Sequence, residues 1–404
     1  MKKKHAILFS IIFSPAVVYA SPRGSEFDIT QTPTGGGMSG VGTVLPQDPV
    51  AMLFGNPSTL SHVESDNTFT FGASYILIDL DASNNGSNPF APEFSGSSDL
   101  DEAILPSAAF VQRIDKKTII GFGLTGISGL GSDFRNELST SAPIVSDLKL
   151  FGTNFVIAHQ VNSNFSVGSA FTLGIGSLQV GLASNSAVVN ATGVGFAVGF
   201  DYELANVHIG GKYKSSLSVN YENVTETAPG VYSDFELEQP QEVTFGFSTT
   251  DSLWENGFVE VDFRWKNWDE AQGYNGFWKD QMVTSIGGQI ERGNWQFRSG
   301  YSYSSDILKD AEDLGNNIGD LSQVYIPGAG VVPISPTFIQ LFQATATNGY
   351  WKQNFSLGIG YKIGENIALD VYSGISFDGE VTISPGLEAE GRVMYIGSGI
   401  TWRI

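Results

Sequence analysis

The stretch that decides the fold is Phe355-Ser356-Leu357-Gly358-Ile359-Gly360-Tyr361-Lys362-Ile363. Residues of one parity are all apolar, and residues of the other parity are small or charged. Successive side chains of a β-strand point to opposite faces, so this segment predicts a strand with one lipid-facing side and one wet side. The segment from Val259 to Lys266 alternates in the same way.

Fourteen segments of this kind follow one another along the chain. They lie near residues 69–77, 106–111, 119–127, 151–161, 165–175, 194–204, 207–214, 243–249, 258–266, 282–290, 295–303, 355–363, 367–374 and 393–404. Gaps after even-numbered segments are short, as at 205–206, whereas gaps after odd-numbered ones are long, up to 304–354. Short periplasmic turns and long outer loops are typical of bacterial outer-membrane barrels. The sequence therefore predicts an all-β fold, a fourteen-stranded antiparallel transmembrane β-barrel, with both chain ends in the periplasm.

The composition agrees with a barrel wall. Charged residues make up 16% of the chain, glycine occurs 48 times and aromatic residues make up 12%. The chain has no cysteine, which excludes metal sites made of thiolates, and we expect neither a metal ion nor a cofactor. A formal net charge of −21 argues against a nucleic-acid partner.

The first residues predict export. Lys2, Lys3 and Lys4 precede an apolar stretch over residues 6–18, and Val18-Tyr19-Ala20 matches a cleavage site. This is the pattern of a secretory signal peptide, and the apolar stretch is too short to span a membrane. We expect a signal peptide over 1–20, an N-terminal hatch over 21–65 and the barrel over 66–404, in a Gram-negative outer membrane.

The segment between the signal peptide and the first strand does not alternate. Its glycine run, Gly35–Gly42, lacks the following helix and the lysine that a phosphate-binding loop needs. Further on, Met52, Leu53 and Phe54 form an apolar group beside glycines and prolines. Apolar groups gain by leaving water, so the segment is predicted to fold into the lumen as a plug.

Several segments resemble the FadL family, the long-chain fatty acid and hydrocarbon transporters of Gram-negative outer membranes. They are, in chain order, Gly35–Ser58 with Asn56-Pro57-Ser58, Ile120–Phe134, Tyr213–Ser215, Pro240–Gly246, Trp265–Trp268 and Asn294–Gly300. Two features depart from the family pattern. Ser58 stands where the hatch signature commonly has alanine, and the last residue, Ile404, stands where barrels typically end on an aromatic residue.

The resemblance implies passive uptake of long-chain fatty acids or related apolar compounds. The molecule would bind in an extracellular groove, move to a pocket against the hatch and leave sideways through the wall. Lateral exit is sensible physically, because a hydrophobic solute gains by entering hydrocarbon. We expect a monomer in contact with membrane lipid and lipopolysaccharide. The acidic stretch 306–320 either holds divalent cations that bridge to lipopolysaccharide or is a solvated loop.

The resemblance also implies a gate where the third strand is interrupted. Its residues would be Gly126, Ser128, Gly129 and Gly131 of that strand, with Asn56 and Pro57 of the hatch against them. Glycines permit a kink and close backbone approach. Ordinary loop glycines and a tight Asn-Pro turn are the alternatives.

Candidate ligand-binding residues are of two kinds. The apolar candidates are Met52, Leu53 and Phe54 in the hatch and Phe338, Ile339, Leu341 and Phe342 in the longest loop. Dense apolar residues in an exposed loop indicate a binding surface, although a packed short helix closing the loop is the alternative. Arg264 and Arg298 have inward parity and are candidates for binding a fatty-acid carboxylate, unless they pair with acids such as Glu260 or Asp262. An aromatic hydrocarbon needs no such cation.

Three other functions fit the sequence less well. A barrel lipase or deacylase would use one of the histidines His62, His159 and His208, but none lies in a local Ser/His motif, so we do not expect an enzyme. A general aqueous porin conflicts with the hatch. A purely structural or adhesive barrel leaves the apolar loop and the hatch signature without a role.

Overall fold

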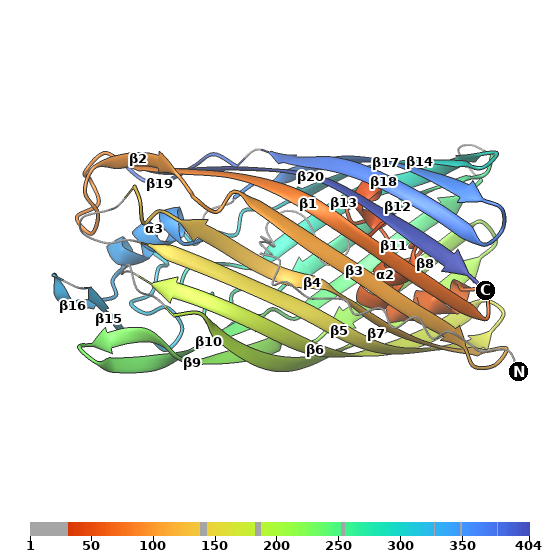
Figure 1. Ribbon diagram of the computed structural model, residues 1–404, viewed down its shortest axis with the longest axis horizontal. Helices are drawn as coiled ribbons and strands as arrows, with labels where there is room; N and C mark the ends of the chain where they lie inside the picture. The colour runs from red at the N-terminus through yellow and green to blue at the C-terminus, as the bar shows by residue number, and fades with distance from the viewer. Residues whose placement is uncertain are drawn as a thin grey trace, which may run out of the picture.

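The protein folds as a closed β-barrel (Figure 1). The computed structural model describes residues 31–137, 144–181, 187–251, 255–326, 328–347, 350–377 and 379–404. Neighbouring strands pair antiparallel around the wall, and the last strand pairs with the first over Thr68–Asn84 and Leu387–Arg403. This pairing closes the sheet and confirms the predicted barrel.

The wall contains all fourteen predicted strands, most of them longer than the sequence indicated. They are β1 (Asn67–Asn84), β3 (Glu102–Arg113), β4 (Thr118–Asp133), β5 (Val145–Asn162), β6 (Phe165–Gly181), β7 (Val189–Leu204), β8 (Val207–Lys214), β11 (Glu242–Thr250), β12 (Gly257–Lys266), β13 (Gln281–Arg292), β14 (Trp295–Ser304), β17 (Gln353–Ile363), β18 (Ile367–Phe377) and β20 (Leu387–Arg403).

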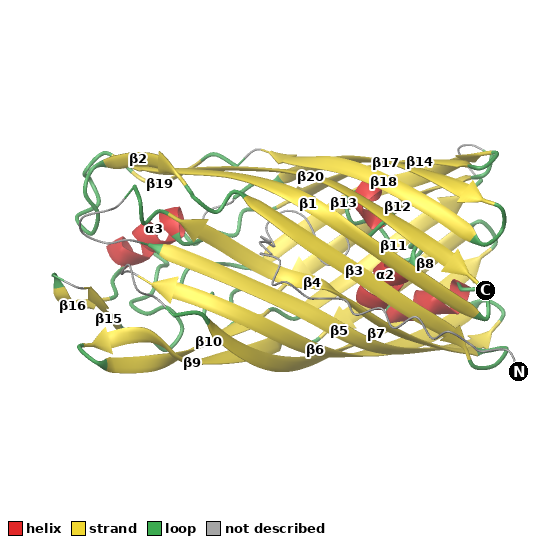
Figure 2. Cartoon of the chain, in the orientation of Figure 1, coloured by secondary structure: helices red, strands yellow, loops and turns green. Residues whose placement is uncertain are grey.

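The remaining elements lie in the loops and in the hatch. Those in the loops are β2 (Phe94–Ser97), β9 (Leu217–Ala228), β10 (Val231–Gln239), β15 (Gln323–Ile326), β16 (Gly330–Pro333), α3 (Pro336–Thr345) and β19 (Val381–Ser384). The hatch contains η1 (Gly35–Met38), α2 (Pro49–Phe54) and η2 (Pro57–His62). Figure 2 shows α2 and α3 at opposite ends of the barrel, with α3 at the end that carries the long loops. Of the helices in the described residues, none is long and apolar enough to cross a membrane.

Alternation along the strands matches the two environments of the wall. On β17, Phe355, Leu357 and Ile359 expose their side chains, whereas Asn354 and Ser356 are buried. The same division recurs around the barrel, so the outer surface is a belt of exposed aliphatic and aromatic side chains. Such a belt suits hydrocarbon, because the transfer of apolar surface out of water is favourable.

Aromatic pairs lie at the end of the barrel that carries the short turns. The ring centroids of Phe69 and Phe110 lie 4.7 Å apart, and those of Trp295 and Tyr361 lie 4.6 Å apart. Aromatic rings favour the boundary between hydrocarbon and water. The final residue, Ile404, exchanges two backbone hydrogen bonds with Asn67, at 2.8 and 3.0 Å, so the wall closes without an aromatic last residue.

This architecture predicts how the purified protein behaves in detergent. The mature chain should give a β-rich circular dichroism spectrum and migrate faster on a gel unheated than boiled, because a closed hydrogen-bonded wall resists unfolding by detergent. A helix-rich spectrum, or identical migration of heated and unheated samples, would contradict the barrel.

Candidate functional site

The hatch lies inside the barrel and touches the wall through glycines. A Cβ on Gly300 of β14 would lie 2.2 Å from the backbone of Met38, and a Cβ on Gly168 of β6 would lie 2.4 Å from the carbonyl carbon of Pro57. No larger residue fits these approaches without moving the hatch backbone. The predicted plug is therefore present, and wall glycines make room for it.

A buried carboxylate organises the hatch itself. Asp48 caps α2 by accepting a hydrogen bond from the backbone N–H of Ala51 at 2.9 Å. Its other oxygen accepts hydrogen bonds from the backbone N–H and the hydroxyl of Thr34, at 2.9 and 2.6 Å. Pro49 occupies the first turn, where its missing N–H costs nothing. Asp48 thus ties α2 to the residue before η1.

Two carboxylates of β12 hold the hatch to the wall. Glu260 and Asp262 are both buried and both face the lumen. The backbone N–H groups that donate to them belong to Gly42 (3.1 Å), Thr43 (3.2 Å), Val44 (2.8 Å) and Leu45 (2.9 Å). These donors and acceptors satisfy one another inside the lumen, where an unpaired buried polar group is costly. This anchor was missed in the sequence, where the two acids were considered only as partners for arginines.

The Asn56-Pro57 signature faces β6 and β7. The amide nitrogen of Asn56 donates to the carbonyl oxygens of Thr43 and Phe200, each at 2.9 Å, and its oxygen accepts from the Ser58 hydroxyl at 2.8 Å. Asn56 thereby joins two parts of the hatch to β7. Neither it nor Pro57 lies directly against the predicted interruption of the third strand.

Apolar residues of α2 meet the third strand instead. Leu53 is fully buried, and a Cβ on Gly121 or Gly123 of β4 would lie 2.5 or 2.7 Å from its methyl groups. Phe54 is buried beside Gly123 and Gly152, and Met52 is buried in the same cluster. The end of α2 is therefore the part of the hatch that faces β4.

The wall has a gap in its hydrogen bonding between β3 and β4. β3 pairs with β1 along Glu102–Gln112, but it pairs with β4 only from Ala108 to Arg113. β4 carries a bulge between Gly126 and Ser128 in its pairing with β5. We call residues 102–107 of β3 and 125–132 of β4 the side window. The predicted gate residues Gly126, Ser128, Gly129 and Gly131 all lie in it.

Side chains fill the side window in this conformation. Leu105 of β3 is fully buried, and a Cβ on Gly126 would lie 2.3 Å from one of its methyl groups. Phe151 of β5 packs against the same cluster. The hydroxyls of Ser107, Thr125 and Ser128 are buried, and no hydrogen-bond partner for them occurs in the described part of the chain.

An apolar cavity of about 420 Å³ lies among the long loops. We call it the outer pocket. Phe338 and Phe342 of α3 line it, with Phe235 of β10 and Val324 of β15. Ile339 and Leu341, the other candidates in this segment, are buried in the core cluster. The segment is thus both a packed short helix and a wall of a cavity.

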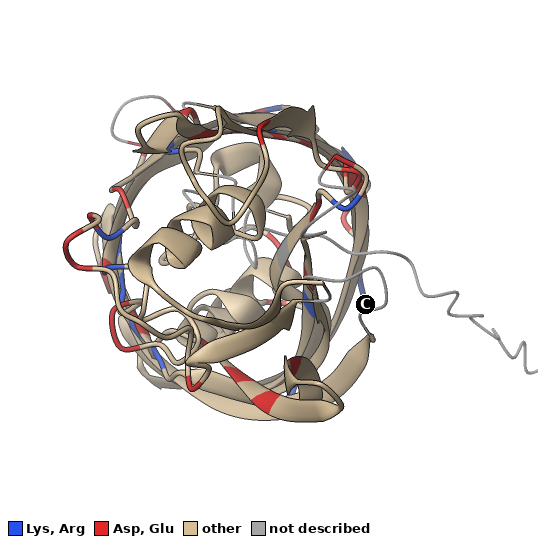
Figure 3. Cartoon of the chain, turned by 90° about the vertical axis from the view of Figure 1, so that its left-hand side faces the viewer, with Lys and Arg blue, Asp and Glu red and all other residues tan. Residues whose placement is uncertain are grey.

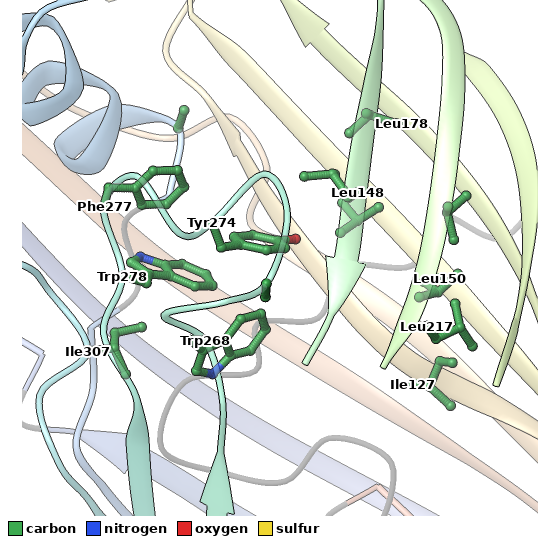
Figure 4. Packing of buried hydrophobic residues seen from close by; sticks show 14 of the residues in the cluster. Ile127, Leu148, Leu150, Leu178, Leu217, Trp268, Tyr274, Phe277, Trp278 and Ile307 are labelled. Atoms are coloured by element: carbon green, nitrogen blue, oxygen red, sulfur yellow. The ribbon is translucent and has the colours of Figure 1, made fainter. Parts of the chain in front are cut away.

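A group of aromatic rings lies between the outer pocket and the barrel interior. Trp268, Tyr274, Phe277 and Trp278 follow β12, and the Tyr274 and Trp278 rings stack with centroids 4.6 Å apart. Figure 4 shows Tyr274 and Trp268 facing leucines of β5 and β6 across the interior. These residues belong to one contact cluster that extends from α3 to α2 of the hatch.

The two candidate arginines face the lumen from β12 and β14. Arg298 of β14 forms an ion pair with Asp370 at 2.6 Å and donates to the side-chain oxygens of Gln289 and Gln296, at 2.6 and 3.2 Å. Arg264 of β12 is buried and interacts electrostatically with Asp262. Both point inward, as predicted, and neither lines the outer pocket.

Two of the three histidines come together near the short turns. His62 of η2 bonds to Asp201 of β7 at 2.9 Å, and its ring centroid lies 6.5 Å from that of His208. His159 contacts Thr118 at 3.2 Å. Among the hydrogen bonds of the described residues, none links a serine hydroxyl to His62 or His208. The described part of the chain also contains no group of three His, Asp or Glu side chains placed to hold a metal ion.

The chain is similar to known proteins in sequence pattern and in fold. The model of the outer membrane protein transport protein family (OMPP1/FadL/TodX) matches residues 20–314. The chain belongs to this family. It is therefore an outer-membrane β-barrel of a family that transports hydrophobic compounds, as the resemblance in the sequence implied.

Solved structures with the same fold share little sequence with this member of the family. The toluene transporter TodX of Pseudomonas putida matches with a TM-score of 0.67 and 15% identity, over 94% of this chain and 99% of that one. A FadL homologue of Pseudomonas aeruginosa matches with a TM-score of 0.65 and 17% identity, over 96% of this chain and 100% of that one. The toluene transporter TbuX of Ralstonia pickettii matches with a TM-score of 0.63 and 16% identity, over 94% of this chain and 99% of that one. Comparison with curated protein sequences gives no match.

The anchor on β12 predicts that the plug can be loosened without removing it. In the double variant Glu260→Gln, Asp262→Asn, each amide keeps one acceptor oxygen and turns an NH₂ group toward the remaining backbone donors. We expect each hydrogen bond lost to lower the free energy of unfolding by about 0.5–1.5 kcal/mol, and the ion conductance in planar bilayers to increase. Glu388→Gln, at an exposed acid of β20, is the control. A double variant that stays as closed as the parent would show that the anchor does not hold the plug.

Proposed function

We propose that the protein takes up small hydrophobic molecules by passive diffusion and releases them sideways into the outer membrane. Capture occurs in the outer pocket, passage follows the apolar cluster to α2 of the hatch, and exit uses the side window. The observation that carries the proposal is the gap in hydrogen bonding between β3 and β4, which lies where that cluster reaches the wall at Ile127.

The proposed exit follows from the chemistry on each side of the wall. Leu53 and Phe54 of the hatch lie against β4, and exposed apolar side chains such as Phe122 and Phe155 cover the outer face. A hydrophobic solute that leaves through the window passes from one apolar environment to another. Release past the hatch would lead it into water, which is unfavourable.

The substrates we propose are long-chain fatty acids or related apolar compounds, with aromatic hydrocarbons as the main alternative. The cavity of about 420 Å³ accommodates either class. The fold likeness to a toluene transporter and to a FadL homologue is compatible with both.

A first test fills the side window. Gly129→Ile and Gly131→Ile each place a β-branched side chain in β4, where it favours an extended wall and occupies the gap. Uptake of labelled decanol and toluene should fall by about tenfold or more, equivalent to ~1.4 kcal/mol on the barrier, while binding in the outer pocket persists.

The matched control for these variants is Thr192→Ile, which adds bulk to an exposed position of β7, away from the window. Undiminished uptake by folded glycine variants in the outer membrane would count against lateral exit. It would favour passage into the periplasm.

A second test addresses capture. Phe338 is buried against the outer pocket, so Phe338→Ala should weaken ligand binding by up to about 1.5–3 kcal/mol if the ligand covers the ring. Phe342→Ala should act in the same direction. Phe355→Ala, on the lipid-facing side of β17, is the control and should leave binding unchanged. Equal affinities in all three variants would place capture elsewhere.

A further inference from the structure

We infer that the outer pocket selects uncharged apolar molecules over carboxylates of the same size. The substrates would then be neutral compounds, such as hydrocarbons and long-chain alcohols, rather than ionised fatty acids. This inference rests on the proposed uptake function and narrows its substrate class. It follows from where the charges lie.

The outer pocket offers no cation to a carboxylate. Among the described residues that line it, Glu226 carries the sole charge, and none is Lys, Arg or His. Glu226 accepts a hydrogen bond from the backbone N–H of Gly230 at 2.7 Å. The adjoining sequence segments 138–143 and 182–186 contain no Lys or Arg either.

The hairpin beside the pocket is acidic throughout. Residues 217–239, which make up β9 and β10, include no basic residue. Their acids are Glu222, Glu226, Asp234, Glu236 and Glu238. Figure 3 shows acidic residues on the loops around this end of the barrel. Charges within about 8 Å still interact at physiological salt, so the hairpin repels an anion at the pocket.

Nearby basic residues at the loop end are already paired. Lys149 lies 2.6 Å from Asp147, Lys309 lies 2.5 Å from Asp269, and Arg135 pairs with Asp133. Deeper in the lumen, Arg298 pairs with Asp370. A carboxylate that binds one of these four cations would have to displace an existing acid. Burial of an ionised group without a partner is far more costly than burial of a hydroxyl.

The experiment compares decanol with decanoate, which share a chain length and differ in charge. Binding is measured near neutral pH by equilibrium dialysis against the full-length protein in nanodiscs, and empty nanodiscs give the lipid background. We expect the parent protein to bind decanol at least about tenfold more tightly than decanoate.

A cation placed in the pocket should reverse the preference. Thr225 lines the pocket, and its buried hydroxyl has no partner among the described residues. Thr225→Lys should raise decanoate affinity by about tenfold and leave decanol affinity unchanged. Asn220→Lys makes the same change of charge at an exposed position of β9 outside the pocket and should raise decanoate affinity far less than Thr225→Lys does.

The outcomes separate this inference from the proposed function. Equal affinity for decanol and decanoate in the parent, each weakened by Phe338→Ala, would overturn the charge selection and leave the uptake function standing. An equal gain in the two lysine variants would also overturn the inference, because the selection would then not lie in the pocket. Binding of neither ligand above the nanodisc background would overturn both.

Discussion

In hydrocarbon, every backbone N–H and C=O group must find its hydrogen bond inside the protein, and this requirement governs the whole structure. The pairing of β20 with β1 leaves the wall without a free edge. The interruption between β3 and β4 is closed by contacts within the same part of the wall. Backbone and side-chain hydrogen bonds from Ser98 and Asp99 rejoin the chain to Asp133 beyond the window, and Leu105 fills the space between.

The closed wall encloses a lumen, and the hatch occupies it. Two kinds of contact hold the hatch to the wall. On β12, Glu260 and Asp262 hold the hatch by accepting four backbone hydrogen bonds. Toward β4, Leu53 and Phe54 make apolar contacts, and the Asn154 amide of β5 donates a hydrogen bond to the Leu53 carbonyl oxygen at 2.8 Å. The hatch is therefore held by hydrogen bonds on both sides, and the side toward β4 adds apolar packing.

The sequence predicted the barrel well because alternation is a local signal. Each strand such as β17 carries its own two-residue period, so no distant contact is needed to recognise it. The loops were harder. The hairpin of β9 and β10 alternates as a wall strand does, but its buried residues pack against glycines of β6 and β7 inside the barrel, and a local pattern does not reveal which partner a strand packs against. The anchor on β12 was missed because its partners are backbone groups more than 200 residues away, which leave no side-chain signature. The Asn56 contact with Phe200 is hidden for the same reason.

The bulge in β4 explains how a wall can open without breaking its ladder. Thr125 pairs with Gly152 and Ser128 with Leu150, so one extra residue separates the two pairs and the strand bends. β4 pairs with β3 from Ile119 to Leu124, before the bulge, and after the bulge it pairs only with β5. Under the proposed lateral exit, a solute would displace the buried Leu105 side chain and would break no strand pairing, because residues 102–107 of β3 have no partner on β4.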